Sequence, residues 1–319
     1  MGRTKHQKKI VIIGGGTGLS TLLRGLKKLP LDITAIVTVA DDGGSSGRLR
    51  DEYDIPPPGD IRNVLAALSE VEPLVEEMFQ YRFSNSAELD GHSLGNLMLT
   101  ALTSITGDFA NAISEMSRVL NVHGKVLPAA NQVVTLHAKF DDGTIISGES
   151  KIPGYGKKIE TVFISPADVK PLPETINTIR KADIIAIGPG SLYTSILPNL
   201  LVEDIKTAII DSKAKKVYIC NLMTQAGETG SYTAYDHVKA LIDHVGENFL
   251  DSILISKEEI PENVQYLYKQ EKASPVKIDI DKLESLGIEI VKKDISVVHD
   301  GAVRHDALEV AKWLVEYAD

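Results

Sequence analysis

The residues best placed to do chemistry lie in a glycine cluster near the start of the chain. An apolar run over residues 9–13 stops abruptly at Gly14, Gly15, Gly16, Thr17 and Gly18. A run of β-branched residues predicts a buried parallel strand, and glycines, which lack a Cβ, allow a sharp turn after it. Leucines then recur at helical spacing over residues 19–26, so the free N–H groups of a helix N-terminus would point over the glycines. We expect such a turn to bind a phosphate group.

This glycine pattern does not by itself identify a nucleotide. Gly14 and Gly16 fit the Gly-x-Gly-x-x-Gly fingerprint of dinucleotide-binding folds, but Leu19 stands where the third glycine belongs. No Gly-Lys-Ser/Thr follows the glycines, which excludes a P-loop. A plain tight turn between a strand and a helix explains the cluster equally well at this point.

Three further loops rich in Gly, Ser or Thr follow segments with the composition of buried strands. They are residues 41–47 after 33–39, residues 188–195 after 182–187, and residues 221–230 after 216–220. The carboxyl ends of parallel strands lie at one edge of an open sheet, where the ligand crevice forms. Few Lys or Arg residues accompany the four loops, so we expect backbone amides and hydroxyls to hold a phosphate ester.

The alternation of strands and helices predicts an α/β fold. We expect a Rossmann-like, three-layer, doubly wound and mainly parallel sheet, with residues 1–319 forming one domain. Residues 131–165 alternate apolar and polar side chains around the turn Asp141-Asp142-Gly143, which predicts a β-rich insertion, a small antiparallel excursion. Helices are expected over residues 61–71, 94–105, 109–120, 173–181, 202–211, 233–245 and 305–317. Residues 258–294 are polar and mixed.

Asp41 and Asp42 are the sharpest polar feature of the predicted crevice. A carboxylate after the second strand can hydrogen-bond a ribose or sugar hydroxyl, or hold Mg²⁺ against a phosphate. The alternative is a turn with solvated side chains. Because Gly43 to Ser46 extend the same loop, we expect one of the two acids to act, and the sequence does not choose between them.

Other polar residues in these loops complete the predicted nucleotide and phosphate site. They are Ser45, Ser46, Asn63, His92, Asn96, Gly188, Gly190, Ser191 and Asn221. A lone histidine is more often a structural hydrogen-bonding group, so that role is favoured for His92. Arg48, Arg50 and Arg62 could meet a pyrophosphate or be solvated surface residues. The sequence contains no His-Glu-x-x-His and no paired cysteine, and we predict no catalytic residue.

Composition narrows the class of protein. The chain is 43% hydrophobic and 24% charged, as in soluble globular proteins, and its net charge of −10 argues against a nucleic-acid-binding surface. It has no signal-type segment and no apolar run long enough to span a bilayer, and its single cysteine, Cys220, can form no internal disulfide. We therefore expect a cytoplasmic protein.

Six ordered motifs carry a resemblance to a known family. They are residues 12–19, 40–50, 58–63, 91–96, 188–195 and 221–225. Together they resemble the bacterial gluconeogenesis factor family (YvcK-like), within the CofD-like superfamily, over nearly the whole chain. Asp41 and Asp42 look like the acidic loop of that superfamily, and Asn221 looks like its late asparagine.

The resemblance implies a Rossmann-like cytoplasmic protein needed for cell shape and for growth on gluconeogenic carbon sources. It implies a nucleotide-sugar ligand of the UDP-N-acetylglucosamine type and a protein partner in cell-envelope regulation. The sister branch, 2-phospho-L-lactate transferase, moves a phospholactyl group from a nucleotide diphosphate to an alcohol with Mg²⁺. The resemblance does not decide whether that chemistry is retained here.

The leading hypothesis is a regulatory binder. The pyrophosphate would lie on the glycine cluster and on Gly190 and Ser191. The uridine and sugar would lie near Asp41, Asp42, Ser45, Asn63 and Asn221, with Asp41 as the candidate Mg²⁺ ligand. The rival hypothesis is a Mg²⁺-dependent transferase. GDP and NAD stay open as alternative ligands, as does self-association of the chain.

Overall fold

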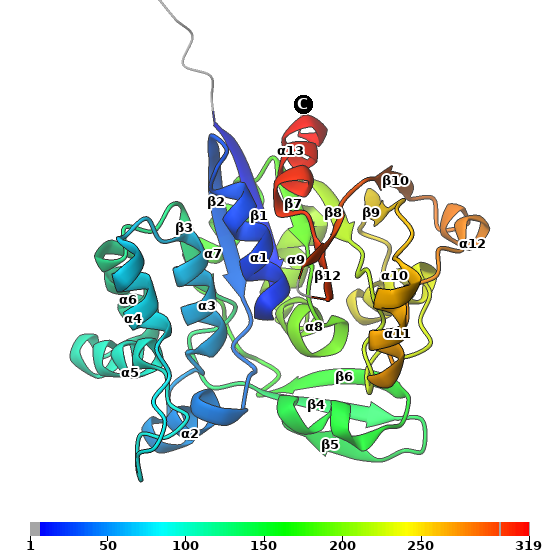
Figure 1. Ribbon diagram of the computed structural model, residues 1–319. Helices are drawn as coiled ribbons and strands as arrows, with labels where there is room; N and C mark the ends of the chain where they lie inside the picture. The colour runs from blue at the N-terminus through cyan, green and yellow to red at the C-terminus, as the bar shows by residue number, and fades with distance from the viewer. Residues whose placement is uncertain (1–6, 300, 319) are drawn as a thin grey trace, which may run out of the picture.

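A seven-stranded sheet forms the centre of the computed structural model, which describes residues 7–299 and 301–318 (Figure 1). The strands run in the order β10-β9-β8-β7-β1-β2-β3, and neighbouring strands pair in parallel. Their bounds are β1 Lys8–Gly14, β2 Leu31–Val37, β3 Lys125–Pro128, β7 Ile184–Ile187, β8 Lys215–Ile219, β9 Ser252–Ser256 and β10 Glu289–Lys293. The chain leaves β1 in one direction through β2 and returns to its other side at β7, so the switch point of the sheet lies between β1 and β7. The start of the chain, where no signal-type segment is predicted, lies outside the described residues as far as residue 6.

Helices cover both faces of this sheet, which confirms the Rossmann-like, doubly wound α/β prediction. One layer contains α1, α3 and α13, and the other contains α7 and α9. The helix bounds are α1 Gly16–Leu26, α2 Gly44–Tyr53, α3 Gly59–Leu68, α4 Pro73–Gln80, α5 Leu94–Thr106, α6 Phe109–Val119, α7 Pro173–Lys181, α8 Leu197–Leu200, α9 Glu203–Asp211, α10 Ala234–Val245, α11 Glu262–Gln270, α12 Ile280–Glu284 and α13 Ala307–Tyr317. Residues 10–13 of β1 are fully buried, as expected for a parallel strand covered on both faces.

Several elements differ from the prediction. Helix α2 begins at Gly44, inside the stretch predicted as a loop, because its glycines and serines give no apolar periodicity. Strand β3 was not predicted, and the polar stretch 258–294 forms α11, α12 and β10. The last helix begins at Ala307, since residues 302–305 form β12, which pairs with β11 (Ser296–His299). The helix predicted over residues 233–245 is α10, and Thr233 and Asp236 form a capping box at its start.

The antiparallel excursion is also confirmed. Strands β4 (Thr135–Phe140), β5 (Ile145–Ser147) and β6 (Ile159–Ser165) form a sheet in the order β5-β4-β6, with the short turns η1 (Glu149–Lys151) and η2 (Pro153–Tyr155) beside it. Figure 1 shows this insertion beyond the carboxyl ends of β1 and β2. It docks through a hydrogen bond from the Ser150 amide to Asp42 Oδ1 (2.8 Å) and one from the Val162 amide to His244 Nε2 (3.0 Å). The insertion thus lies over the edge where the predicted crevice forms.

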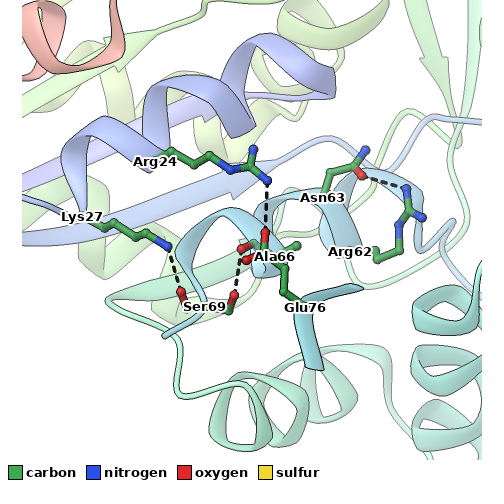
Figure 2. Close-up of polar contacts among 7 residues, drawn as sticks. All are labelled: Arg24, Lys27, Arg62, Asn63, Ala66, Ser69 and Glu76. Atoms are coloured by element: carbon green, nitrogen blue, oxygen red, sulfur yellow. Dashed lines mark hydrogen bonds and ion pairs between the residues drawn. The ribbon is translucent and has the colours of Figure 1, made fainter. Parts of the chain in front are cut away.

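Polar contacts fix α1 against α3 and α4 on one face of the sheet (Figure 2). Lys27 Nζ, just after α1, donates to the Ser69 carbonyl at the end of α3 (2.8 Å), and Arg24 reaches Glu76 of α4 at 3.5 Å. The Arg24 pair is exposed and contributes little stability. The Lys27 contact joins the C-terminal ends of α1 and α3, whose N-terminal ends carry the glycine cluster and Asp60.

The β11–β12 hairpin closes over the end of β8. His305 Nε2 lies 3.0 Å from the Cys220 carbonyl. Burial lowers the pKa of His305 to about 4, so the ring is neutral near pH 7 and donates this hydrogen bond through Nε2. No helix in the described part of the chain is long and apolar enough to cross a membrane.

Candidate functional site

The floor of the crevice is built from glycines that follow β1 and β7 and whose backbones lie in contact. A Cβ on Gly18 would lie 2.9 Å from the Pro189 carbonyl oxygen, and one on Gly190 would lie 3.3 Å from the Gly15 carbonyl oxygen. Gly15 has no room for a side chain, because an added Cβ would lie 2.5 Å from Thr38 Cγ2 and 2.6 Å from Asp60 Oδ2. The first turn of α1 therefore lies directly against the loop that follows β7. Only residues without a Cβ allow this approach.

The loop after β7 is held in place by a late asparagine. Asn221, at the end of β8, donates from Nδ2 to the Gly190 carbonyl (2.9 Å), while its Oδ1 has no partner in the described structure. Gly188 has a φ of +81°, which favours glycine, and the Ser191 carbonyl accepts from the amides of Ser195 and Ile196. The structure thus brings predicted residues from three loops together at the β1/β7 switch point.

Asp41 and Asp42 have different surroundings. Asp42 Oδ1 accepts the Ser150 amide of the insertion, and a Cβ on Gly148 would lie 2.3 Å from its Oδ2. Asp41 uses Oδ1 for the Gly43 amide (2.8 Å). Its Oδ2 points toward Gly59, where an added Cβ would lie 3.0 Å away from it. Asp42 is therefore committed to docking the insertion, whereas Asp41 keeps an oxygen at the start of α3.

Ser45, His92 and Asn96 come together in one buried network. Ser45 Oγ lies 2.9 Å from His92 Nδ1 and accepts from Asn96 Nδ2 at 3.0 Å. All three side chains are buried, and burial lowers the pKa of His92, so its ring is neutral near pH 7. This network joins the start of α2 to α5. It places Ser46, the next residue, beside Gly59, where a Cβ would lie 2.3 Å from Ser46 Oγ.

Two of the three arginines predicted as possible pyrophosphate contacts form hydrogen bonds away from the glycine cluster, and the third lies near the crevice. Arg48 donates to the Asp90 carbonyl and Arg50 to Thr135 Oγ1. Arg62 donates from Nη2 to Asn63 Oδ1 at 2.7 Å, as Figure 2 shows, and is close enough to Asp60 and Asp41 to interact with both charges. The crevice thus contains one buried arginine, Arg62, on its α3 side.

Asp60, which comes just before the helix predicted over residues 61–71, faces the glycine cluster. Burial and the nearby Asp41 charge raise the pKa of Asp60 to about 6, against a hydrogen bond from the Gly16 backbone that lowers it. Its only signal in the sequence is the motif Pro58-Gly59-Asp60 at a helix start.

Glu149, in the η1 turn of the insertion, lies close enough to Asp41 and Asp60 to interact with their charges. Burial raises the pKa of Glu149 to about 8, and the charges of Asp41, Asp60, Glu228 and Asp42 act in the same direction. At neutral pH the fold therefore favours a protonated Glu149. Nothing in the glycine-rich and lysine-rich stretch around this residue indicates such a position in the sequence.

Glu228 is a third residue that sequence reasoning missed. Its side chain is buried, and burial raises its pKa. One carboxylate oxygen accepts the Tyr193 amide (3.1 Å), and the other accepts Thr194 Oγ1 (2.9 Å) and Gln225 Nε2 (3.1 Å). Glu228 therefore ties the loop after β8 to the π-helical turn η3 (Leu192–Ile196) that follows Gly190 and Ser191.

We predict that Glu228→Ala lowers the free energy of unfolding by about 1–3 kcal/mol, because it leaves the buried Tyr193 amide and Thr194 hydroxyl without an acceptor. Glu228→Gln keeps one acceptor oxygen and should lose less. Urea unfolding of both variants at pH 7 measures the difference. Equal stability of Glu228→Ala and the wild type would show that the hydrogen bonds of Glu228 do not contribute to the free energy of unfolding.

The described residues contain no group of three His, Cys, Asp or Glu side chains arranged to hold a metal ion. Mg²⁺ commonly uses one or two carboxylates together with substrate phosphates and water. Asp41 Oδ2 and Ser46 Oγ both lie against Gly59 and supply oxygen ligands of the kind Mg²⁺ prefers. These residues therefore fit a cation that arrives with a diphosphate.

Comparison with known proteins gives the family. The chain is 62% identical to a gluconeogenesis factor of Bacillus subtilis (strain 168) over 311 residues, covering 98% of both chains. It belongs to the gluconeogenesis factor family. A second gluconeogenesis factor, from Halalkalibacterium halodurans, is 60% identical and spans 97% of this chain and 96% of its own length.

Two further matches agree with this membership. The family model described as 2-phospho-L-lactate transferase CofD matches residues 10–296. The crystal structure of a Bacillus halodurans protein superposes with a TM-score of 0.96 at 60% identity, covering 97% of this chain and 100% of that one. The resemblance to gluconeogenesis factors of the CofD-like superfamily, inferred from six motifs, is thus confirmed.

Proposed function

We propose that this gluconeogenesis factor family member binds a nucleotide sugar of the UDP-N-acetylglucosamine type and acts as a regulatory factor. The observation that carries the proposal is the backbone contact between the glycine cluster and Gly190 at the β1/β7 switch point. The exposed amides of a helix N-terminus next to glycines are suited to a diphosphate. The pyrophosphate lies over Gly15 to Gly18 and Gly190 to Ser191.

Electrostatics supports Mg²⁺ as a companion of the ligand. A diphosphate on the glycine cluster would face Asp41 and Asp60, with Arg62 as the nearby buried cation. A divalent cation on Asp41 Oδ2 relieves that repulsion, and when bound it supplies charge neutralisation to the diphosphate. The chain's own residues do the rest: Asn221 positions Gly190, and Asp42 holds the insertion over the site.

The role in the cell follows from the relatives. Their name, gluconeogenesis factor, supports a role in growth on gluconeogenic carbon sources. We further propose roles in cell shape and in cell-envelope regulation, exerted in the cytoplasm through a protein partner that reads ligand occupancy. The second candidate function is a Mg²⁺-dependent transferase, favoured by the match to the transferase family model.

Calorimetric titration tests the proposal. The purified chain is titrated with UDP-N-acetylglucosamine, UDP-glucose, GDP and NAD, each with and without Mg²⁺, and the nucleotide is checked afterwards by chromatography. We expect selective binding of UDP sugars with the nucleotide recovered intact. Mg²⁺-dependent consumption of a nucleotide-linked donor would favour the transferase, and absence of binding to any nucleotide would reject both functions.

Asp41→Asn should weaken UDP-N-acetylglucosamine binding about tenfold in the presence of Mg²⁺, because loss of one charge-assisted contact to the cation costs about 1.4 kcal/mol. The variant should bind the ligand equally with and without Mg²⁺. Asp51→Asn, an exposed carboxylate on α2, is the matched control and should leave both affinities unchanged. If Asp41→Asn retains the full effect of Mg²⁺ on affinity, the cation is bound by other residues.

A further inference from the structure

Helix α4 presents apolar side chains to solvent. Leu74 is 66% exposed, Met78 is 52% exposed, and Tyr81, at the C-cap of the helix, is 53% exposed. Phe79 is the one buried residue of α4. A surface helix ordinarily turns its apolar side chains to the core and its charged side chains to water. Helix α4 therefore carries an apolar face on its solvent side, which no described residue covers.

Helix α5, which follows α4 in the chain, extends this apolar surface. None of its 13 residues is charged, although charged residues make up 24% of the whole chain. Five of its residues are buried, whereas Ala101 and Ile105 are exposed, Ile105 to 77%. A helix without charged residues is typical of a position that is covered on all sides. The exposed apolar residues of the two helices, here called the α4–α5 face, are Leu74, Val75, Met78, Tyr81, Ala101 and Ile105.

Backbone contacts fix the two helices against each other. The Leu94 amide at the start of α5 donates to the Tyr81 carbonyl (2.8 Å). Phe79 packs against Gly95 of α5, where an added Cβ would lie 2.5 Å from the Phe79 carbonyl oxygen and 2.9 Å from its ring. Figure 1 shows α4 and α5 together on one side of the molecule, with α11 on the opposite side. The α4–α5 face therefore stands on a fixed support.

The charges that flank this face are complementary to themselves. Glu77 precedes Met78 and Arg82 follows Tyr81, and both charged residues are exposed. When two copies of α4 lie antiparallel about a two-fold axis, residue i of one copy meets residue j of the other, and j meets i. Glu77 then lies opposite the partner's Arg82, while Met78 lies opposite the partner's Tyr81. Each of these contacts is made twice.

The composition of α4 favours a protein over a lipid surface as the occupant. Helices that bind membrane surfaces carry Lys and Arg on their polar side, because the cytoplasmic leaflet is anionic. Helix α4 contains Glu76 and Glu77 but neither Lys nor Arg. An uncharged centre with charges of both signs at the rim is instead the arrangement of protein–protein interfaces.

We propose that the α4–α5 face is the contact surface of a two-fold symmetric dimer of this chain. Helix α4 packs antiparallel against the partner's α4, and α5 extends the apolar contact on each side. Burial of Leu74, Met78 and Tyr81 in both copies drives the association, and the two pairs between Glu77 and the partner's Arg82 fix its register. The inference does not depend on the nucleotide ligand.

Sedimentation equilibrium of the full chain at micromolar concentration tests the inference. We expect the wild type to have twice the mass of the chain. Met78→Lys should raise the dissociation constant of the dimer about a hundredfold, because each dimer loses two central apolar contacts. Tyr266→Lys on α11, where the side chain is 65% exposed, is the matched control and should dimerise like the wild type. Circular dichroism checks that each variant is folded. A monomeric wild type overturns the inference, as does a Met78→Lys variant with an unchanged dissociation constant.

Exchange of the flanking charges tests the antiparallel arrangement. Glu77→Arg alone and Arg82→Glu alone should each raise the dissociation constant about tenfold, because like charges then face each other across the axis. Glu77→Arg combined with Arg82→Glu in one chain restores opposite charges and should return the constant to within about threefold of the wild type. A combined variant that dimerises more weakly than either single variant overturns the arrangement. A monomeric wild type that sediments with phosphatidylcholine vesicles would assign the face to a lipid surface and overturn the dimer.

Discussion

Replacing Gly18 by alanine should weaken UDP-N-acetylglucosamine binding about a hundredfold. The added Cβ would lie 2.9 Å from the Pro189 carbonyl oxygen and 3.3 Å from the Gly190 amide nitrogen. Both neighbours are backbone atoms, so no side chain can turn away, and α1 must separate from the loop after β7. A displacement of about 1 Å at a positioning group can lower a reaction rate about 10²-fold, and we expect a loss of the same order in affinity here. The amides of α1 and of the loop after β7 would no longer contact the diphosphate together.

The control for Gly18→Ala is Gly154→Ala. Gly154 lies in the η2 turn of the insertion, has an ordinary φ, and has nothing within 4 Å of an added Cβ. It therefore matches the chemical change without the steric conflict, and its affinity should equal that of the wild type. Calorimetric titration with Mg²⁺ measures both variants. A Gly18→Ala chain that is folded and binds normally would show that the diphosphate does not use this floor.

The second large effect is a pH-dependent stabilisation by Glu149→Gln. The native fold raises the pKa of Glu149 to about 8 from an ordinary value of 4.5, mainly through burial and secondly through the Asp41 charge. A carboxyl with a raised pKa favours the protonated native state, so the wild type loses stability as the pH rises from about 4.5 to about 8. Glutamine resembles the protonated acid and does not ionise.

We therefore expect equal stabilities of the wild type and Glu149→Gln near pH 4.5 and a growing advantage of the variant above it. The advantage should reach on the order of 5 kcal/mol at pH 9, since a rise in pKa from 4.5 to about 8 corresponds to about 1.4 kcal/mol for each pH unit between the two values. Urea unfolding in the presence of a chelator, at pH values from 4.5 to 9, measures the difference.

Glu160→Gln is the control for Glu149→Gln. Glu160 lies in the same insertion but is exposed and paired with Lys139, so its removal should change stability by less than about 1 kcal/mol at any pH. A difference between Glu149→Gln and the wild type that is the same at pH 4.5 and pH 9 would contradict a raised pKa. The insertion would then dock without a proton on Glu149.

For Asp41 and Asp42, the sequence predicts the position of the two acids but not the role of each. Their position after β2 at the ligand edge was predictable, because parallel strands place all their carboxyl ends together. Which acid keeps a free oxygen was not, because Asp42 is occupied by the amide of Ser150, 108 residues away. The same holds for Ser45, His92 and Asn96, whose mutual hydrogen bonds depend on how α2 meets α5.

By itself, the sequence determined the fold class, the family, the antiparallel insertion and the glycine-rich loops of the site, since these follow from apolar periodicity, turn-forming residues and ordered motifs read along the chain. Only the tertiary structure brought Asp60, Glu149 and Glu228 to the crevice. A carboxylate's pKa depends on burial and on charges that are close in space but distant in the chain. Local sequence carries neither kind of information.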